Sequence, residues 1–249
     1  SVKNNLRPLL KRICDILYRL KLKNDLPCVK SSFTYRIMSN FKSWIMASRP
    51  KTLSAAVVPI LASVGLVMSE NQSVHWTLVL CALFSSFFIQ IGTNLVNDAM
   101  DFKKGADTEN RLGPQRVTQM GIFTFKQVMW AATFCFIISI FLGIPLVMAG
   151  GWPIVVIGLV SVAMGYAYTS GPFPLAYRGL GDLFVILFFG LIAVGGLYYI
   201  LTGRYNISAL VLGFQIGMLS TVLIAINNLR DINSDVLVNK KTLAVRLGE

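Results

Sequence analysis

Six long apolar segments constrain this chain of 249 residues more than any other feature of its sequence. A helix needs about 20 mostly apolar residues to cross the hydrocarbon core of a bilayer. Charged residues make up only 14% of the chain, against about 25% in a typical soluble domain, so a soluble globular or disordered chain is excluded. The sequence therefore predicts an all-α, polytopic transmembrane helix bundle with spans at residues 53–68, 76–96, 128–149, 152–170, 181–201 and 207–229.

The distribution of basic residues predicts how this bundle is oriented. Residues 1–51 contain 12 of the 23 Lys and Arg residues, and a cytoplasmic N-terminus places 22 of the 23 on the cytoplasmic side, with only Arg204 outside. This asymmetry follows the positive-inside rule of membrane proteins. The net charge of +12 is therefore expected to face the anionic bilayer surface, and we expect no nucleic-acid partner.

Residues 1–40 form a basic extension ahead of the apolar region. Apolar residues in this extension follow the i, i+3, i+4 spacing of one helix face, and the basic residues lie off that face. The pattern predicts an amphipathic helix on the membrane surface. A targeting segment, which is also basic and poor in acids, and a disordered extension are the alternatives. The apolar face consists of Leu9, Leu10, Ile13, Ile16, Leu17 and Leu20.

Polar residues gather at the cytoplasmic ends of the second and the sixth predicted span. Within each group they recur every three or four residues, which places them on one face of a helix. Asp107 and Glu109 follow the first group in the adjoining loop. The first group is Asn94, Asn97, Asp98 and Asp101, and the second is Asn227, Asp231 and Asp235.

These acids predict a cation site if the two spans face each other. Carboxylates at close range cannot all stay ionised without cations. Their oxygens suit Mg²⁺, which proteins hold with one or two carboxylates plus substrate phosphates. These acids, together with the basic residues near them, predict a diphosphate site at the mouth of an apolar cavity. The bases that could contact phosphate are Lys103, Lys104, Arg111, Arg116, Arg230, Lys240, Lys241 and Arg246.

Other interpretations of the same residues stay open. An Asn in a membrane helix often serves only as a hydrogen-bonding contact between helices, and an acid at a span end can be solvated loop charge. A membrane cation transporter could also use acidic stripes, although its acids are expected near the bilayer midplane. Here the acids lie at the cytoplasmic ends of the spans.

Four segments resemble the UbiA superfamily of membrane prenyltransferases. GTNLVNDAMDFKKGADTENRLGPQRVTQ (92–119) resembles the first aspartate-rich motif of that family, and NNLRDINSD (227–235) resembles the second. ASRPKTLSAAVVPIL (47–61) and YAYTSGPFPLAYRGLGD (166–182) are similar to the branch that prenylates 1,4-dihydroxy-2-naphthoate in menaquinone synthesis. The resemblance runs over residues 44–249, and residues 1–40 lie outside it.

The resemblance implies an activity: Mg²⁺-dependent transfer of a polyprenyl group from polyprenyl diphosphate to 1,4-dihydroxy-2-naphthoate. Diphosphate and CO₂ are lost, and demethylmenaquinol is formed. A related aromatic prenyltransferase that uses 4-hydroxybenzoate or another acceptor is the alternative. The implied location is the inner (cytoplasmic) membrane, with the active-site loops cytoplasmic.

The resemblance also implies a role for each site residue. Family members usually have about nine spans, so we expect this chain to be truncated at its C-terminus. Asp98, Asp101, Asp231 and Asp235 are the expected catalytic acids. The expected metal ligands are these four acids and Asp107, and the expected substrate-binding residues are Asn94, Asn97, Lys104, Arg111, Arg116, Asn227, Lys241, Arg49, Lys51 and Tyr168.

Overall fold

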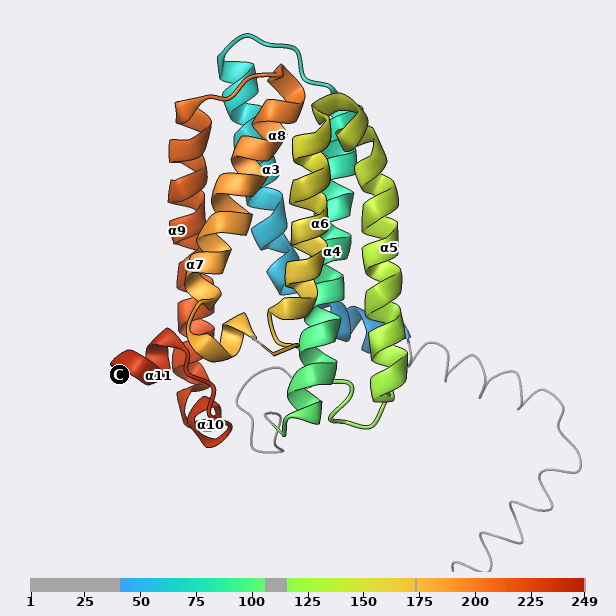
Figure 1. Ribbon diagram of the computed structural model, residues 1–249, viewed down its shortest axis with the longest axis vertical. Coiled ribbons are helices and arrows are strands. Elements are labelled where there is room, and N and C mark those ends of the chain that lie inside the picture. Colours follow the sequence, from blue (N-terminus) through green and yellow to red (C-terminus); the bar gives the residue numbers. More distant parts are fainter. Residues whose placement is uncertain (1–40, 106–115, 173, 249) are drawn as a thin grey trace, which may run out of the picture. The chain divides into compact units, whose positions relative to one another are not determined.

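The computed structural model describes residues 41–105, 116–172 and 174–248 (Figure 1). The chain divides into a unit Ser1–Trp44 and a larger unit Ile45–Glu249, and the larger unit carries the features described below. The predicted amphipathic helix in residues 1–40 lies outside the described residues, as do Asp107 and Arg111.

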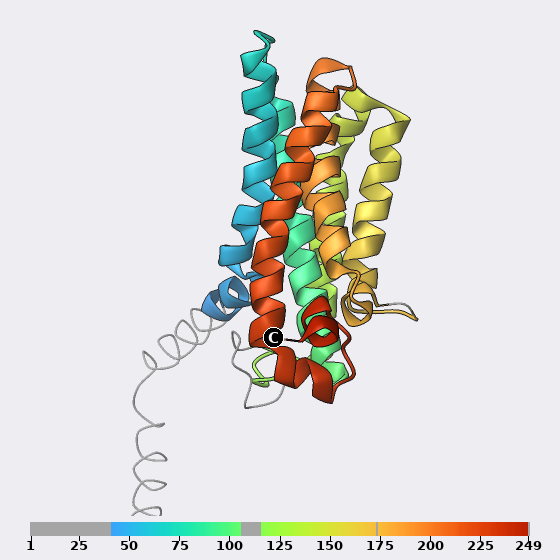
Figure 2. The same cartoon turned by 90° about the vertical axis from the view of Figure 1, so that its left-hand side faces the viewer.

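Helices make up most of the larger unit, and the described residues contain no strand. Within the described residues, five helices are long and apolar enough to cross a membrane, and they lie side by side (Figures 1 and 2). The predicted all-α polytopic bundle is therefore confirmed. The five helices are α3 (Pro50–Ser69), α4 (Trp76–Lys103), α5 (Phe125–Gly150), the helix Gly181–Thr202 and α9 (Ile207–Arg230).

The fourth predicted span is shorter than the sequence suggested. We expected it at 152–170, whereas α6 covers Trp152–Ala167, or 16 residues. At 1.5 Å per residue this helix is about 24 Å long, which is less than the hydrocarbon thickness of about 30 Å. The chain turns at Gly171, whose φ is +80°, and Pro172 and Pro174 follow. Proline cannot continue a helix in this position because it lacks the backbone N–H.

The helix Gly181–Thr202 owes its close contact with α9 to glycines. It consists of α7 (Gly181–Val185), the π-helical η2 (Ile186–Ile192) and α8 (Ala193–Thr202). A Cβ on Gly190 would lie 2.8 Å from the Cα of Gly217 and would also collide with the carbonyl oxygen of Gly213. Small residues of this kind allow helix backbones to approach closely inside a membrane.

One end of the bundle is closed by packed side chains and hydrogen bonds. Val67 and Val79 are buried there in one cluster with Leu197, Tyr198 and other apolar residues. The carboxylate of Glu70 accepts a hydrogen bond from the Tyr198 hydroxyl at 2.6 Å and another from Asn206 Nδ2 at 2.8 Å. These bonds join the C-terminal end of α3 to α8 and to the start of α9.

The opposite end, where α4 and α9 finish, is built from shorter elements. A 3₁₀ helix, η1 (Leu175–Arg178), precedes α7, and two short helices, α10 (Ile232–Leu237) and α11 (Leu243–Leu247), follow α9 (Figure 1). The segment 116–124 leads into α5, which begins with a capping box between Thr124 and Gln127. Both predicted polar stripes therefore finish at this end of the bundle, which is called the motif end below.

Candidate active site

A cavity of about 710 Å³ lies at the motif end between α3, α4, α7 and α9. Residues of both predicted stripes contribute to its walls, so the condition under which the sequence predicts a joint site, that the two spans face each other, is met at this end. The polar residues that line it are Arg49, Lys51, Thr52, Gln90, Thr93, Asn94, Asn97, Asp101, Arg116, Tyr168, Thr169, Asp182, Ser220, Asn227, Asn228, Arg230, Asp231, Lys240 and Thr242.

Asp101 is held in place by two partners that come from distant parts of the sequence. Arg116 Nη2 donates to Asp101 Oδ2 at 2.7 Å, and the hydroxyl of Tyr177 donates to Oδ1 at 2.8 Å. Arg116 Nη1 also donates to the backbone oxygen of Asn97 at 2.6 Å. Asp101 and Arg116 are both 4% exposed. This carboxylate is therefore oriented before any substrate arrives.

Asp98 occupies a different environment, although it belongs to the same stripe. It is 2% exposed and does not line the cavity. Its two oxygens accept hydrogen bonds from the backbone N–H groups of Val117 and Thr118, at 3.1 and 3.2 Å. Asp98 thus fixes the loop that carries Arg116, and the metal-binding role expected from the sequence stays a prediction.

The two acids of the second motif are each paired with a base. Arg230 donates to both oxygens of Asp231 at 2.8 Å, and Lys240 Nζ donates to Asp235 Oδ1 at 3.1 Å. Burial raises the pKa of Asp235 above its ordinary value, and the cation of Lys240 opposes that rise. Asp235 Oδ2 is buried without a hydrogen-bond partner, which is costly unless another ligand satisfies it.

Other predicted substrate-binding residues have mostly structural contacts. Asn94 donates through Nδ2 to the backbone oxygen of Ser48 and to Thr52 Oγ1, at 3.1 and 3.0 Å, so it joins α4 to the start of α3. Asn227 lines the cavity. The side chain of Lys241 is exposed and does not belong to the cavity wall.

Lys104 does not line the cavity. Its Nζ donates to the backbone oxygen of Thr169 at 2.6 Å and lies 4.0 Å from the centre of the Tyr177 ring. Desolvation by burial lowers the pKa of Lys104, and the charge of Asp101 partly offsets this effect. Thr169 also donates through its hydroxyl to Asn97 Oδ1 at 2.7 Å. These contacts join α4 to the segment after α6.

A third group of residues lines the side of the cavity between α3 and α7. Arg49 and Lys51 stand at the start of α3, Tyr168 follows α6, and Asp182 belongs to α7; all four line the cavity. Arg49 has a φ of 52°, a left-handed conformation that is uncommon for a residue with a side chain. Such strain is found most often where a side chain must be placed at a functional site.

The side-chain atoms at the motif end that could coordinate a metal suit a hard cation only in part. No group of three or more His, Cys, Asp or Glu side chains that could hold a metal ion occurs within the described ranges. The available ligands are nevertheless all oxygens, and the orphaned Oδ2 of Asp235 is a free acceptor. Because Mg²⁺ is usually held by one or two carboxylates together with substrate phosphates, these residues fit a metal that binds together with a phosphate group.

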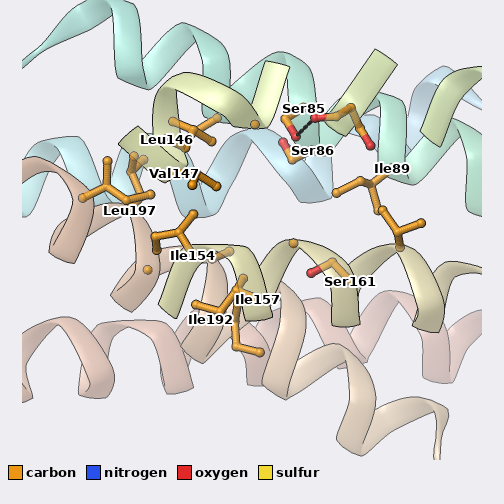
Figure 3. A pocket seen from close by; sticks show the side chains of 18 of the residues that line it. Ser85, Ser86, Ile89, Leu146, Val147, Ile154, Ile157, Ser161, Ile192 and Leu197 are labelled. Carbon is orange, nitrogen blue, oxygen red and sulfur yellow. Dashed lines mark hydrogen bonds between the residues drawn. The ribbon is translucent and has the colours of Figure 1, made fainter. Parts of the chain in front are cut away.

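A second cavity of about 400 Å³ lies deeper in the bundle and is almost entirely apolar. Leu146, Ile154, Ile157 and Leu197 point into it from three helices (Figure 3). The few polar groups in its wall include Ser85, which donates to the backbone oxygen of Ser139. The two cavities share the lining residues Ile89, Gln90 and Phe189, so the polar cavity adjoins an apolar one.

Two site residues were missed by reasoning from the sequence alone. Tyr177 orients Asp101, and Asp182 lines the cavity. Both residues lie in the segment 166–182. A signal was available for Asp182: it is an acid at the beginning of a long apolar helix, and acids within a membrane are costly and usually functional.

Comparison with known proteins identifies a family and several relatives that this chain resembles. The profile of the UbiA prenyltransferase family matches residues 56–249. The chain is 34% identical to 1,4-dihydroxy-2-naphthoate octaprenyltransferase of Haemophilus influenzae over 85% of its length and 71% of that protein. It is 38% identical to the Escherichia coli protein of the same name, over 87% of the chain and 72% of that protein. It is 25% identical to 2-carboxy-1,4-naphthoquinone phytyltransferase of Synechocystis, over 83% of the chain and 66% of that protein.

Proposed function

The chain belongs to the UbiA prenyltransferase family, and on that premise we propose that it transfers a polyprenyl group from polyprenyl diphosphate to 1,4-dihydroxy-2-naphthoate. It is a multi-pass membrane protein and a prenyltransferase. The observation that carries the proposal is the pair of adjoining cavities: one is polar and lined by acids and bases, and the other is apolar. An amphiphilic donor with a charged head and a hydrocarbon tail matches that pair.

The polar cavity is the proposed site of the diphosphate. Asp101, Asp231 and Asp235 would hold Mg²⁺ together with the diphosphate, with one or two carboxylates to each ion, and the metal would supply positive charge where the diphosphate leaves. Asn227, which lines the cavity, would contact the diphosphate. Arg116, Arg230 and Lys240 are the bases placed beside these acids, and they are suited to bind the remaining phosphate oxygens. Groups fixed in this way stabilise the charge that develops as the bond to diphosphate breaks.

The apolar cavity is the proposed site of the first isoprene units. Its walls exclude water, which would otherwise capture the allylic cation that remains after diphosphate leaves. Phe189 stands at the junction of the two cavities. The reacting carbon of the donor is therefore expected at that junction, within reach of an acceptor in the polar cavity.

The acceptor is proposed from the relatives and from the remaining side chains of the polar cavity. Two of the relatives are named for 1,4-dihydroxy-2-naphthoate, and the third for a carboxylated naphthoquinone. Arg49 and Lys51 offer charge to a carboxylate, and Tyr168 offers a hydrogen bond to a hydroxyl group. We also propose the inner (cytoplasmic) membrane as the location, with the motif end cytoplasmic. The excess of basic residues at that end supports this orientation.

A prenyl-transfer assay tests the proposal. Membranes that contain the chain are supplied with a radiolabelled polyprenyl diphosphate, Mg²⁺ and either 1,4-dihydroxy-2-naphthoate or 4-hydroxybenzoate, with EDTA as the control. Prenylated naphthoquinol that forms with Mg²⁺ and is lost with EDTA is the expected result. Product from 4-hydroxybenzoate alone would overturn the acceptor assignment. Absence of product from both acceptors would overturn the proposed function.

A further inference from the structure

Asp182 differs from the acids of the two predicted motifs at this end of the bundle. Asp101 pairs with Arg116, Asp231 with Arg230 and Asp235 with Lys240. In the described part of the chain, the carboxylate of Asp182 takes part in no ion pair, although Asp182 lines the polar cavity together with Asp101 and Asp231. An acid without a cation at the start of a membrane helix is costly to keep there, and the diphosphate chemistry proposed above does not use it.

Tyr168 lies next to this acid. The hydroxyl of Tyr168 is so close to Gly181 that a Cβ added to that glycine would lie 3.0 Å from it. Burial raises the pKa of Tyr168, and the charges of Asp182, Asp101 and Asp235 raise it further, in that order. Tyr168 therefore keeps its proton and can serve as a hydrogen-bond donor beside Asp182.

The surroundings of Asp182 suit a flat aromatic molecule. Phe184 and Phe189 line the cavity on the same helix. The rings of Tyr168 and Phe184 have centroids 6.2 Å apart, and Phe184 stacks on Phe188 at 4.2 Å. Aromatic rings prefer such offset or tilted neighbours at these separations. This side of the cavity thus combines an aromatic wall, a hydroxyl donor and one acid without a cation.

We propose that Asp182 is the general base for the aromatic acceptor and that Tyr168 helps to position the acceptor's hydroxyl against it. This inference rests on the proposed function, because it assigns a residue to the acceptor half of that reaction. A base of this kind must lie within reach of the hydroxyl whose oxygen feeds electrons into the ring. Asp182 can take this role without displacing a salt-bridge partner.

The proton moves in a closed cycle. The bond between the allylic carbon and the diphosphate oxygen breaks, and its electron pair leaves with diphosphate. The ring carbon that bears the carboxylate then forms a bond to the allylic carbon, while the neighbouring hydroxyl gives its proton to Asp182 and becomes a ketone. Loss of CO₂ leaves its electron pair in the ring as an enolate. Asp182 returns the proton to that oxygen, and the hydroquinone is restored.

The test compares Asp182→Asn, which has the same shape, with Asp182→Glu, which keeps the carboxylate. General-base catalysis contributes about 10²–10⁴-fold in rate, so we expect Asp182→Asn to lower kcat by about 100-fold or more, with the KM for polyprenyl diphosphate unchanged. Asp182→Glu should retain a larger share of the activity. Glu70→Gln, an acid-to-amide change at the closed end of the bundle, is the matched control and should keep the kcat of the unaltered chain, because Glu70 lines neither cavity.

A second readout separates a base from a structural residue. A ring-fluorinated naphthoate has a more acidic hydroxyl, which gives up its proton with less help from a base. The decrease in kcat caused by Asp182→Asn should therefore be smaller with this acceptor. An equal loss with both acceptors, or a raised KM for the donor, would overturn the assignment. If the unaltered chain forms no product in the same assay, it is the proposed function that fails, and this inference fails with it.

Discussion

Replacing Gly190 by alanine tests the close contact between the π-helical segment and α9. The added Cβ would lie 2.8 Å from the Cα and 3.0 Å from the nitrogen of Gly217, and it would collide with the carbonyl oxygen of Gly213. All of these are backbone atoms, so no side chain can rotate away. The two helices must separate, and the packing around them must follow.

The size of the effect follows from two opposing terms. Overpacking of this kind costs about 1–3 kcal/mol, and backbone contacts place Gly190 at the upper end of that range. Alanine regains about 1 kcal/mol because it is a better helix former than glycine. The net loss in the free energy of unfolding is therefore about 2 kcal/mol. For a chain of this size, each 1 kcal/mol shifts Tm by about 2–4 °C, so Tm should fall by about 4–8 °C.

The assay is thermal unfolding in detergent micelles, followed by the loss of helical circular dichroism. Gly65→Ala is the matched control, because Gly65 also lies inside a helix but a Cβ there would meet no atom within 4 Å. The Gly65→Ala variant should keep its Tm, or its free energy of unfolding should rise by up to about 1 kcal/mol. A Tm for Gly190→Ala equal to or above that of Gly65→Ala would refute the argument.

Three further substitutions probe the motif end. Asp231→Ala should lower prenyl-transfer turnover by at least about 100-fold, which corresponds to a barrier about 2.7 kcal/mol higher, while the protein still inserts into the membrane. Turnover equal to that of the unaltered chain would show that Asp231 has no role in the active site. Asp98→Asn should lower the free energy of unfolding by about 1–3 kcal/mol, because one backbone N–H of the loop loses its acceptor. The Mg²⁺ concentration that gives half the maximal rate should not change. A clear rise in that concentration would show that Asp98 is a metal ligand. Tyr177→Phe deprives Asp101 of a charge-assisted hydrogen bond and should cost about 1.5–3 kcal/mol in the same unfolding assay, so an unchanged Tm would contradict the role given to Tyr177.

The fold could be predicted from the sequence to the extent that it depends on local properties. Hydropathy and length identify the spans because a helix must satisfy its own backbone groups in lipid. The polar stripe from Asn94 to Asp101 was predictable for the same reason, because residues three or four apart share a helix face. The shortened α6 shows where hydropathy is insufficient: Tyr168 and Thr169 lie in an apolar stretch, but the glycine and prolines after them end the helix.

The partners of the site residues could not be predicted, because they come from distant segments. Nothing near Asp98 in the sequence indicates that its oxygens accept from the backbone of residues 117 and 118. The same holds for Tyr177, which reaches Asp101 across 76 positions. Spacing within one helix indicates which side chains share a face, but only tertiary packing decides whether an acid faces a cavity or a loop.

The balance of charge in the polar cavity gives a final expectation about metal binding. Its wall carries three acids, of which Asp182 is one, against five basic side chains, so the cavity has an excess of positive charge before any ligand binds. Mg²⁺ alone should therefore bind weakly, because it must compete with Arg116, Arg230 and Lys240 for the acids. A diphosphate reverses the balance by engaging those bases. Titration calorimetry should show tight Mg²⁺ binding only when a non-reactive prenyl diphosphate analogue is present, whereas equally tight binding of Mg²⁺ without the analogue would mean that the acids form a metal site by themselves.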